Sequence, residues 1–122
     1  MLKKSFVILL FSYISLFGFE HLNPLDMKEK LENKKVVIDF YATWCPPCKI
    51  VAQNLVEFDK IKPKDVFIYK VDVDEYKEIA LDYGVQGLPT LAYFKNGKLV
   101  AKELGLRSVK QLSQDVKKYL EK

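Results

Sequence analysis

Cys45 and Cys48 are the only cysteines in the 122-residue chain, and both residues between them are prolines. Thiols at this spacing could hold a metal, tether a haem, form a structural disulfide or exchange disulfides. A zinc site needs four ligands, and the single histidine, His21, lies far away in the sequence. Haem attachment needs a histidine directly after the second cysteine, where the chain has Lys49, and an iron–sulfur cluster needs four cysteines. The sequence therefore predicts neither a metal site nor a haem.

A structural disulfide is the remaining alternative to redox chemistry. Closing so short a loop constrains the unfolded chain little, well below the ~3 kcal/mol of a 15-residue loop. The cysteines also lie where an apolar strand pattern ends and a helical pattern begins. The N–H groups and the dipole at a helix start favour a thiolate, which is the reactive form of cysteine. We therefore interpret Cys45 as the nucleophile at the exposed helix start, and Cys48, one turn later and more covered, as the resolving thiol.

Strand and helix patterns alternate on both sides of this pair. Residues 36–42 form a nearly continuous apolar, β-branched run, which is typical of a central strand buried on both faces. Before it, Asn23 and Pro24 predict the N-cap and first position of a helix. The later predicted elements are a helix from Pro46 to about residue 61, a strand at 66–73, a short helix ended by Gly84, a hairpin around Asn96-Gly97, and a last helix opened by a Ser108/Gln111 capping box. This order predicts an α/β domain with a mixed sheet.

Length and composition agree with one domain. Apolar residues make up 49% of the chain, enough for a packed core without disulfide scaffolding. The net charge is +4, with acidic and basic residues interleaved and no basic stripe. We therefore expect no binding to nucleic acid.

The first residues differ in character from the rest. Lys3 and Lys4 precede an uncharged apolar run, residues 5–19, whose fifteen residues match the core of a secretory signal and fall short of the ~20 that span a bilayer. We therefore predict a signal peptide or N-terminal anchor in residues 1–19 and a domain in residues 20–122. No pair of small residues has the usual cleavage spacing, so an uncleaved anchor stays open. The expected location is extracytoplasmic, in a bacterial periplasm, with membrane contact only through residues 1–19.

Three stretches resemble the thioredoxin family: "VVIDFYATWCPPCK", "YKVDVD" and "YGVQGLPTLAYFKNGKLV". The resemblance covers nearly the whole chain after the predicted signal, and the combination of W-C-x-P-C-K with a downstream G-x-P-T is specific. It implies a thioredoxin fold, with a mixed central sheet flanked by helices. It also implies thiol:disulfide exchange through a redox-active disulfide without a cofactor, and a cis peptide bond between Leu88 and Pro89, facing the cysteines.

The resemblance also assigns roles to further residues. Asp39 matches the carboxyl that thioredoxins bury behind the second cysteine, where desolvation would raise its pKa and let it take the Cys48 proton. Lys70 matches the family lysine near that carboxyl, although a strand lysine pointing to water remains an alternative. A client-binding surface is expected from four residues: Trp44, Leu88, Pro89 and Thr90.

The two prolines bear on the direction of electron flow. Thioredoxins commonly have glycine where Pro46 stands, and strongly oxidising relatives have histidine where Pro47 stands. Both prolines lack an N–H that could stabilise the Cys45 thiolate, so we expect a reductant or a moderate exchanger. The expected partners are disulfide-containing client proteins and a membrane or soluble thiol reductant, and the protein is expected to be a monomer. A role in cytochrome c maturation remains a sub-hypothesis. The alternatives are a membrane-tethered cytosolic thioredoxin and a non-catalytic module that binds clients.

Overall fold

The structure is a computed structural model that describes residues 18–121. The predicted signal or anchor lies almost wholly outside these residues, so it stays a prediction. Within the described part of the chain, no helix is both long enough and apolar enough to cross a membrane.

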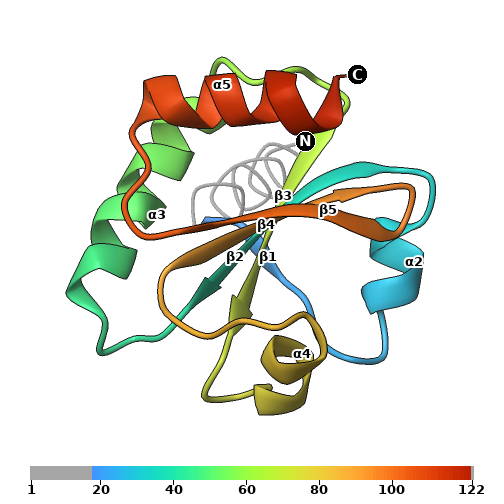
Figure 1. The fold of residues 1–122 in the computed structure, drawn as a ribbon, viewed down its shortest axis with the longest axis vertical. Coiled ribbons are helices and arrows are strands. Elements are labelled where there is room, and N and C mark those ends of the chain that lie inside the picture. Colours follow the sequence, from blue (N-terminus) through green and yellow to red (C-terminus); the bar gives the residue numbers. More distant parts are fainter. Residues whose placement is uncertain (1–17, 122) are drawn as a thin grey trace, which may run out of the picture.

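A five-stranded mixed sheet forms the centre of the domain (Figure 1). In spatial order its strands are β1 (Glu20–His21), β3 (Val66–Asp72), β2 (Lys35–Tyr41), β4 (Thr90–Lys95) and β5 (Lys98–Leu104). The first three strands are parallel, whereas β4 and β5 run antiparallel to their neighbours. The predicted α/β class, mixed sheet and element order are confirmed.

Helices cover both faces of this sheet (Figure 1). Helices α3 (Pro46–Asp59) and α5 (Val109–Leu120) pack on one face, and the short helices α2 (Met27–Leu31) and α4 (Lys77–Asp82) on the other. Side chains alternate between the two faces along a strand. In β2, Val36, Ile38 and Phe40 therefore face α2 and α4, while Val37 faces α3 and α5. This explains why the interior of β2, between Lys35 and Tyr41, is apolar at every position except Asp39.

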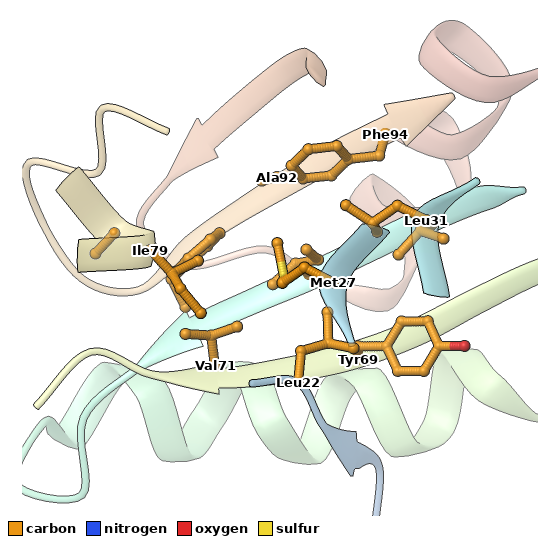
Figure 2. Close-up of a cluster of buried hydrophobic side chains, with 12 residues drawn as sticks. Leu22, Met27, Leu31, Tyr69, Val71, Ile79, Ala92 and Phe94 are labelled. Atoms are coloured by element: carbon orange, nitrogen blue, oxygen red, sulfur yellow. The ribbon is translucent and has the colours of Figure 1, made fainter. Parts of the chain in front are cut away.

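Figure 2 shows the core on the face covered by α2 and α4. Met27 and Leu31 of α2 and Ile79 of α4 meet Val71 of β3 and Phe94 of β4 there, and all five are buried. Because both faces of β2 and β3 are packed in this way, the carboxyl end of β2 is held rigidly. The loop that carries the cysteine pair starts from that end.

Local sequence motifs predicted the positions of two further features, a hairpin turn and a helix start. Asn96 and Gly97 both have positive φ, at 54° and 83°, as a two-residue hairpin turn with the twist of its strands requires. Ser108 and Gln111 form the predicted reciprocal capping box at the start of α5.

The predicted start of α2 was wrong, because its N-cap is Asp26. The Asn23 side chain instead accepts hydrogen bonds from the N–H groups of Leu25 and Asp26, at 2.9 and 3.2 Å. Asn23 thus stabilises a turn before the helix, a competing arrangement that asparagine favours.

Candidate active site

The cysteine pair lies at the amino-terminal end of α3, four residues after β2 ends. Cys45 is the N-cap residue of the helix, and it forms a disulfide with Cys48 across a Cα–Cα distance of 5.3 Å. The N–H of Cys48 donates to Cys45 Sγ at 3.3 Å. Pro46 and Pro47 occupy the first two helical positions, so they leave this N–H as the only backbone donor of the first helical turn near the sulfur.

The structure differs from the expected exposure of the two thiols. We expected Cys48 to be the more covered, but Cys45 is 4% exposed and Cys48 is 3% exposed. In the disulfide form the two cysteines and Ala42 make one buried cluster, against which Tyr41, Val73 and Leu88 pack. Exposure therefore does not distinguish them here, and the assignment of Cys45 as nucleophile depends on its position at the helix start.

Asp39 lies in the middle of β2 on the same face as α3, and it is fully buried. Neither of its carboxylate oxygens has a hydrogen-bond partner among the described residues. Burial raises the pKa of Asp39 from an ordinary 3.8 to about 6, and the positive charge of Lys70 opposes that rise. A buried carboxyl without a structural partner, with a pKa near neutrality, is suited to exchanging a proton.

Lys70 of β3 is the register partner of Asp39. Its ammonium does not simply extend into water, since its Nζ lies 4.4 Å from the centroid of the Tyr41 ring. The hydroxyl of Tyr41 in turn is 2.6 Å from His21 Nε2. Sequence reasoning gave no role to Tyr41 or His21. The usable signal was that Tyr41 comes two residues after Asp39 in a strand, and therefore shares its face.

An apolar groove of about 480 Å³ runs beside Cys45. Its lining includes Trp44, Pro46, Val73 and Leu88. The Trp44 side chain is 67% exposed, and its Nε1–H donates to Asp74 at 2.8 Å, which fixes the indole at the rim. The structure thus brings the predicted surface residues Trp44 and Leu88 together with the nucleophile.

The loop before β4 supplies another part of this surface. The peptide bond between Leu88 and Pro89 is cis, as the resemblance implied. Thr90, which we expected to contact clients, is buried, and its hydroxyl donates to the carbonyl of Gly87 at 2.6 Å. In the structure, Thr90 therefore stabilises the conformation of this loop.

A second wall stands next to Pro89, and sequence reasoning missed it. The N–H of Gly105 donates to the carbonyl of Pro89 at 2.9 Å, and Leu104 and Leu106 on either side are exposed. Arg107 anchors this segment by two hydrogen bonds to the buried Asp115 of α5, at 2.7 and 2.9 Å. No sequence motif marks these residues, because it is the pairing of Thr90 with Leu104 across the hairpin that brings Leu104 here, where it lines a separate cavity of about 180 Å³ next to the groove.

The described residues contain no group of three or more His, Cys, Asp or Glu side chains that could hold a metal ion.

Comparisons with known proteins agree with this chemistry. The family model for thioredoxin matches residues 19–118. Thioredoxin-1 of Saccharomyces cerevisiae is 50% identical over 74 residues, which are 61% of this chain and 71% of that protein. Thioredoxin of Mycoplasmoides gallisepticum is 42% identical over 85 residues, covering 70% of this chain and 84% of that one.

A solved structure is also similar. A mutant thioredoxin from Halobacterium salinarum superposes with a TM-score of 0.75 and 30% identity, covering 84% of this chain and 89% of that one. Thioredoxins are oxidoreductases that act on protein disulfides through a cysteine pair and need no cofactor. By family model, relatives and structure, this chain belongs to the thioredoxin family.

Proposed function

We propose that this protein reduces disulfides in extracytoplasmic client proteins, with Cys45 as the nucleophile. The observation that carries the proposal is the position of the Cys45–Cys48 disulfide, at a helix start and beside an open apolar groove. Such a groove can hold an extended client segment next to the reacting sulfur. A disulfide used only for structure has no need of such a neighbour.

The reaction follows from the arrangement of the groups. In the dithiol form, the Cys45 thiolate attacks one sulfur of a client disulfide, and the other client sulfur leaves as a thiolate that takes up a proton. Asp39 then accepts the proton of Cys48, whose thiolate attacks Cys45 Sγ and releases the second client thiol. The client disulfide has gained two electrons, and the cysteine pair has lost them. A membrane or soluble thiol reductant must return the two electrons.

Asp39 is suited to its role because of where it lies. With a pKa of about 6, its carboxyl is mostly ionised at neutral pH and can accept a proton. Its oxygens have no partner among the described residues, so protonation breaks no structural hydrogen bond. The nearby charge of Lys70 keeps its pKa from rising further.

Trp44 and Leu88 form the client-binding surface with Pro89, and Leu104 and Leu106 extend it. These side chains are apolar and, apart from Pro89, at least partly exposed. An extended client segment can pair with backbone next to Pro89 while its side chains pack on this surface. Recognition would depend mainly on extended, apolar chain, so a broad set of clients is expected.

The location outside the cytoplasm is supported by the sequence of residues 1–19, where two lysines precede fifteen uncharged residues. The test is to express Cys48→Ser in the native organism, trap clients as mixed disulfides with Cys45, and identify them. Clients that are exported proteins would support the proposal, whereas cytosolic clients would indicate a membrane-tethered cytosolic thioredoxin.

The matched control is the double variant Cys45→Ser/Cys48→Ser, which must trap nothing through a disulfide. If clients bind the double variant as well as Cys48→Ser, and the wild-type protein does not reduce insulin, the protein is a non-catalytic binding module.

A further inference from the structure

Four polar side chains gather on the α3 face of the three parallel strands. His21 of β1 and Asp39 of β2 are both register partners of Lys70 in β3, so the three residues form one row across the sheet. Tyr41 lies two residues beyond Asp39, and therefore on the same face. The proposed function uses Asp39 and Lys70 but gives no role to His21 or Tyr41.

Contacts link these residues in a chain. The Lys70 ammonium lies 4.4 Å from the centroid of the Tyr41 ring, within the range of a cation–π interaction. The Tyr41 hydroxyl and His21 Nε2 are 2.6 Å apart, and the two rings meet edge to face with centroids 5.7 Å apart. The ring of Tyr41 thus contacts both His21 and the Lys70 ammonium. We call His21 and Tyr41 the ring clamp.

Without this clamp, little would hold the Lys70 side chain in place. It forms no ion pair within residues 18–121 and is only half-buried, and long lysine side chains readily reach for water. A cavity of about 240 Å³ also lies between the clamp and the active site, and its lining includes Tyr41, Lys70 and Cys48. Lys70 and Cys48 therefore line the same cavity.

We propose that His21 and Tyr41 are positioning residues, which keep the Lys70 charge in the neighbourhood of Asp39 without direct contact and so set the pH range in which that carboxyl exchanges its proton. The part that concerns catalysis rests on the proposed role of Asp39 in resolving the mixed disulfide. The electrostatic part does not rest on that role, because it concerns only the distance between the Lys70 ammonium and the Asp39 carboxyl.

Other charged groups face this cluster from the elements around it. Burial raises the pKa of Tyr41, and so do the negative charges of Asp72 at the end of β3, of Asp39 itself and of Glu75 in the following loop, so the Tyr41 hydroxyl stays neutral and can donate to His21. Lys49 of α3 lines the cavity beside Cys48. For Asp39 the resolved causes are burial and Lys70. Loss of the clamp should therefore act on Asp39 through Lys70.

The test is an NMR titration of the Asp39 carboxyl in the full-length oxidised protein, with circular dichroism to confirm folding. Lys70→Met should raise the pKa of Asp39 by roughly 0.5 to 1, as expected for losing a partly solvated charge a few ångströms away. Tyr41→Leu should produce more than half of that rise, and His21→Ala a smaller rise in the same direction. The matched control is Tyr119→Phe, which removes a tyrosine hydrogen bond, to Glu103, on another part of the sheet.

A double-variant cycle separates the clamp from a general structural effect. If Tyr41 acts through Lys70, Tyr41→Leu/Lys70→Met should match Lys70→Met alone, since the two changes are then not additive. Additive shifts, or a Tyr41→Leu shift no larger than that of Tyr119→Phe, would overturn the proposal. Should Tyr41→Leu fail to fold, His21→Ala and Tyr41→Phe decide, because Tyr41→Phe removes the hydrogen bond alone and His21→Ala removes both the hydrogen bond and the ring contact; an unchanged pKa of Asp39 in both refutes the clamp.

The same variants distinguish this proposal from the proposed function. The rate at which the mixed disulfide is resolved should be measured as a function of pH. In Tyr41→Leu, the midpoint of this pH profile should rise together with the pKa of Asp39. If the pKa of Asp39 moves and the rate profile does not, the proton-acceptor role of Asp39 is wrong while the clamp stands. If neither moves, the clamp is wrong.

Discussion

Replacement of Asp39 by asparagine tests the buried carboxyl most directly. Folding raises the pKa of Asp39 from 3.8 to about 6, so the folded state binds this proton more tightly than the unfolded state does. Stability contributed by the protonated carboxyl is therefore full below pH ~4, falls as the pH rises, and is lost above pH ~6. A shift of about two pH units at ~1.36 kcal/mol each corresponds to roughly 3 kcal/mol.

Asparagine is neutral at every pH in this range and has nearly the same shape. Asp39→Asn should therefore match the wild-type protein at pH 4 and exceed its free energy of unfolding by up to about 3 kcal/mol at pH 7. Urea unfolding of both oxidised proteins at several values between pH 4 and 8 measures this difference. Stability curves that stay parallel across this range would refute the reasoning, as would a variant less stable than the wild type at pH 7.

The same variant should lose activity although it gains stability. Without a carboxyl to take the Cys48 proton, resolution of the mixed disulfide should slow roughly 100-fold, the lower end of what a positioned general base contributes. Stopped-flow measurement with a preformed mixed disulfide isolates this step from client binding. An unchanged rate would show that another group accepts the proton.

Three further predictions concern other parts of the molecule. In the reduced protein, iodoacetamide should alkylate Cys45 at least ~10-fold faster than Cys48, because thiolates at a helix start react first. Peptide mapping measures both rates, and equal rates would contradict the assignment of Cys45 as nucleophile and Cys48 as resolving thiol. Pro47→His should raise the reduction potential, measured by equilibration with glutathione, and each ~30 mV of that rise corresponds to about 1.4 kcal/mol. A wild-type potential near the ~−120 mV of a strong oxidant would contradict the proposed flow of electrons from this protein to its clients. Asp115→Asn removes the negative charge that accepts both hydrogen bonds of Arg107, whose guanidinium keeps Glu103 at 3.8 Å, so it should lower the free energy of unfolding by about 2 kcal/mol, with Gln114→Asn, exposed on the same helix, as the control.

Local sequence signals predicted the parts of the fold that depend on neighbours in the chain. The Asn96-Gly97 turn and the Ser108 capping box need only a few adjacent residues, and both are present as predicted. The burial of Asp39 could also be predicted, since apolar residues surround it in a strand packed on both faces. Asn23 was misassigned because its side chain can stabilise a turn as readily as it can cap a helix.

The remaining features of the site depend on pairings between distant segments. The register of β3 on β2 decides whether Lys70 lies beside Asp39 or faces water. The two strands are joined through a helix, and the sequence of such a connection does not predict their register. The same holds for His21, which reaches Tyr41 only because β1 adds to the outer edge of β3. The identity of residues 1–19 as a signal stays a prediction that only a measurement of location can test.

The anchoring of the second wall, beside Pro89, has a consequence for motion. Leu104 and Leu106 are held beside Pro89 partly through Arg107, whose partner Asp115 belongs to the last helix of the described chain. Any local unfolding that lifts α5 from the sheet must release Arg107, and with it this wall. The amide of Gly105, bonded to Pro89, should then exchange with deuterium at the opening rate of α5. The time for which this wall stays formed is thus limited by the opening of α5, so shortening the chain within α5 should speed the release of any client bound to the wall.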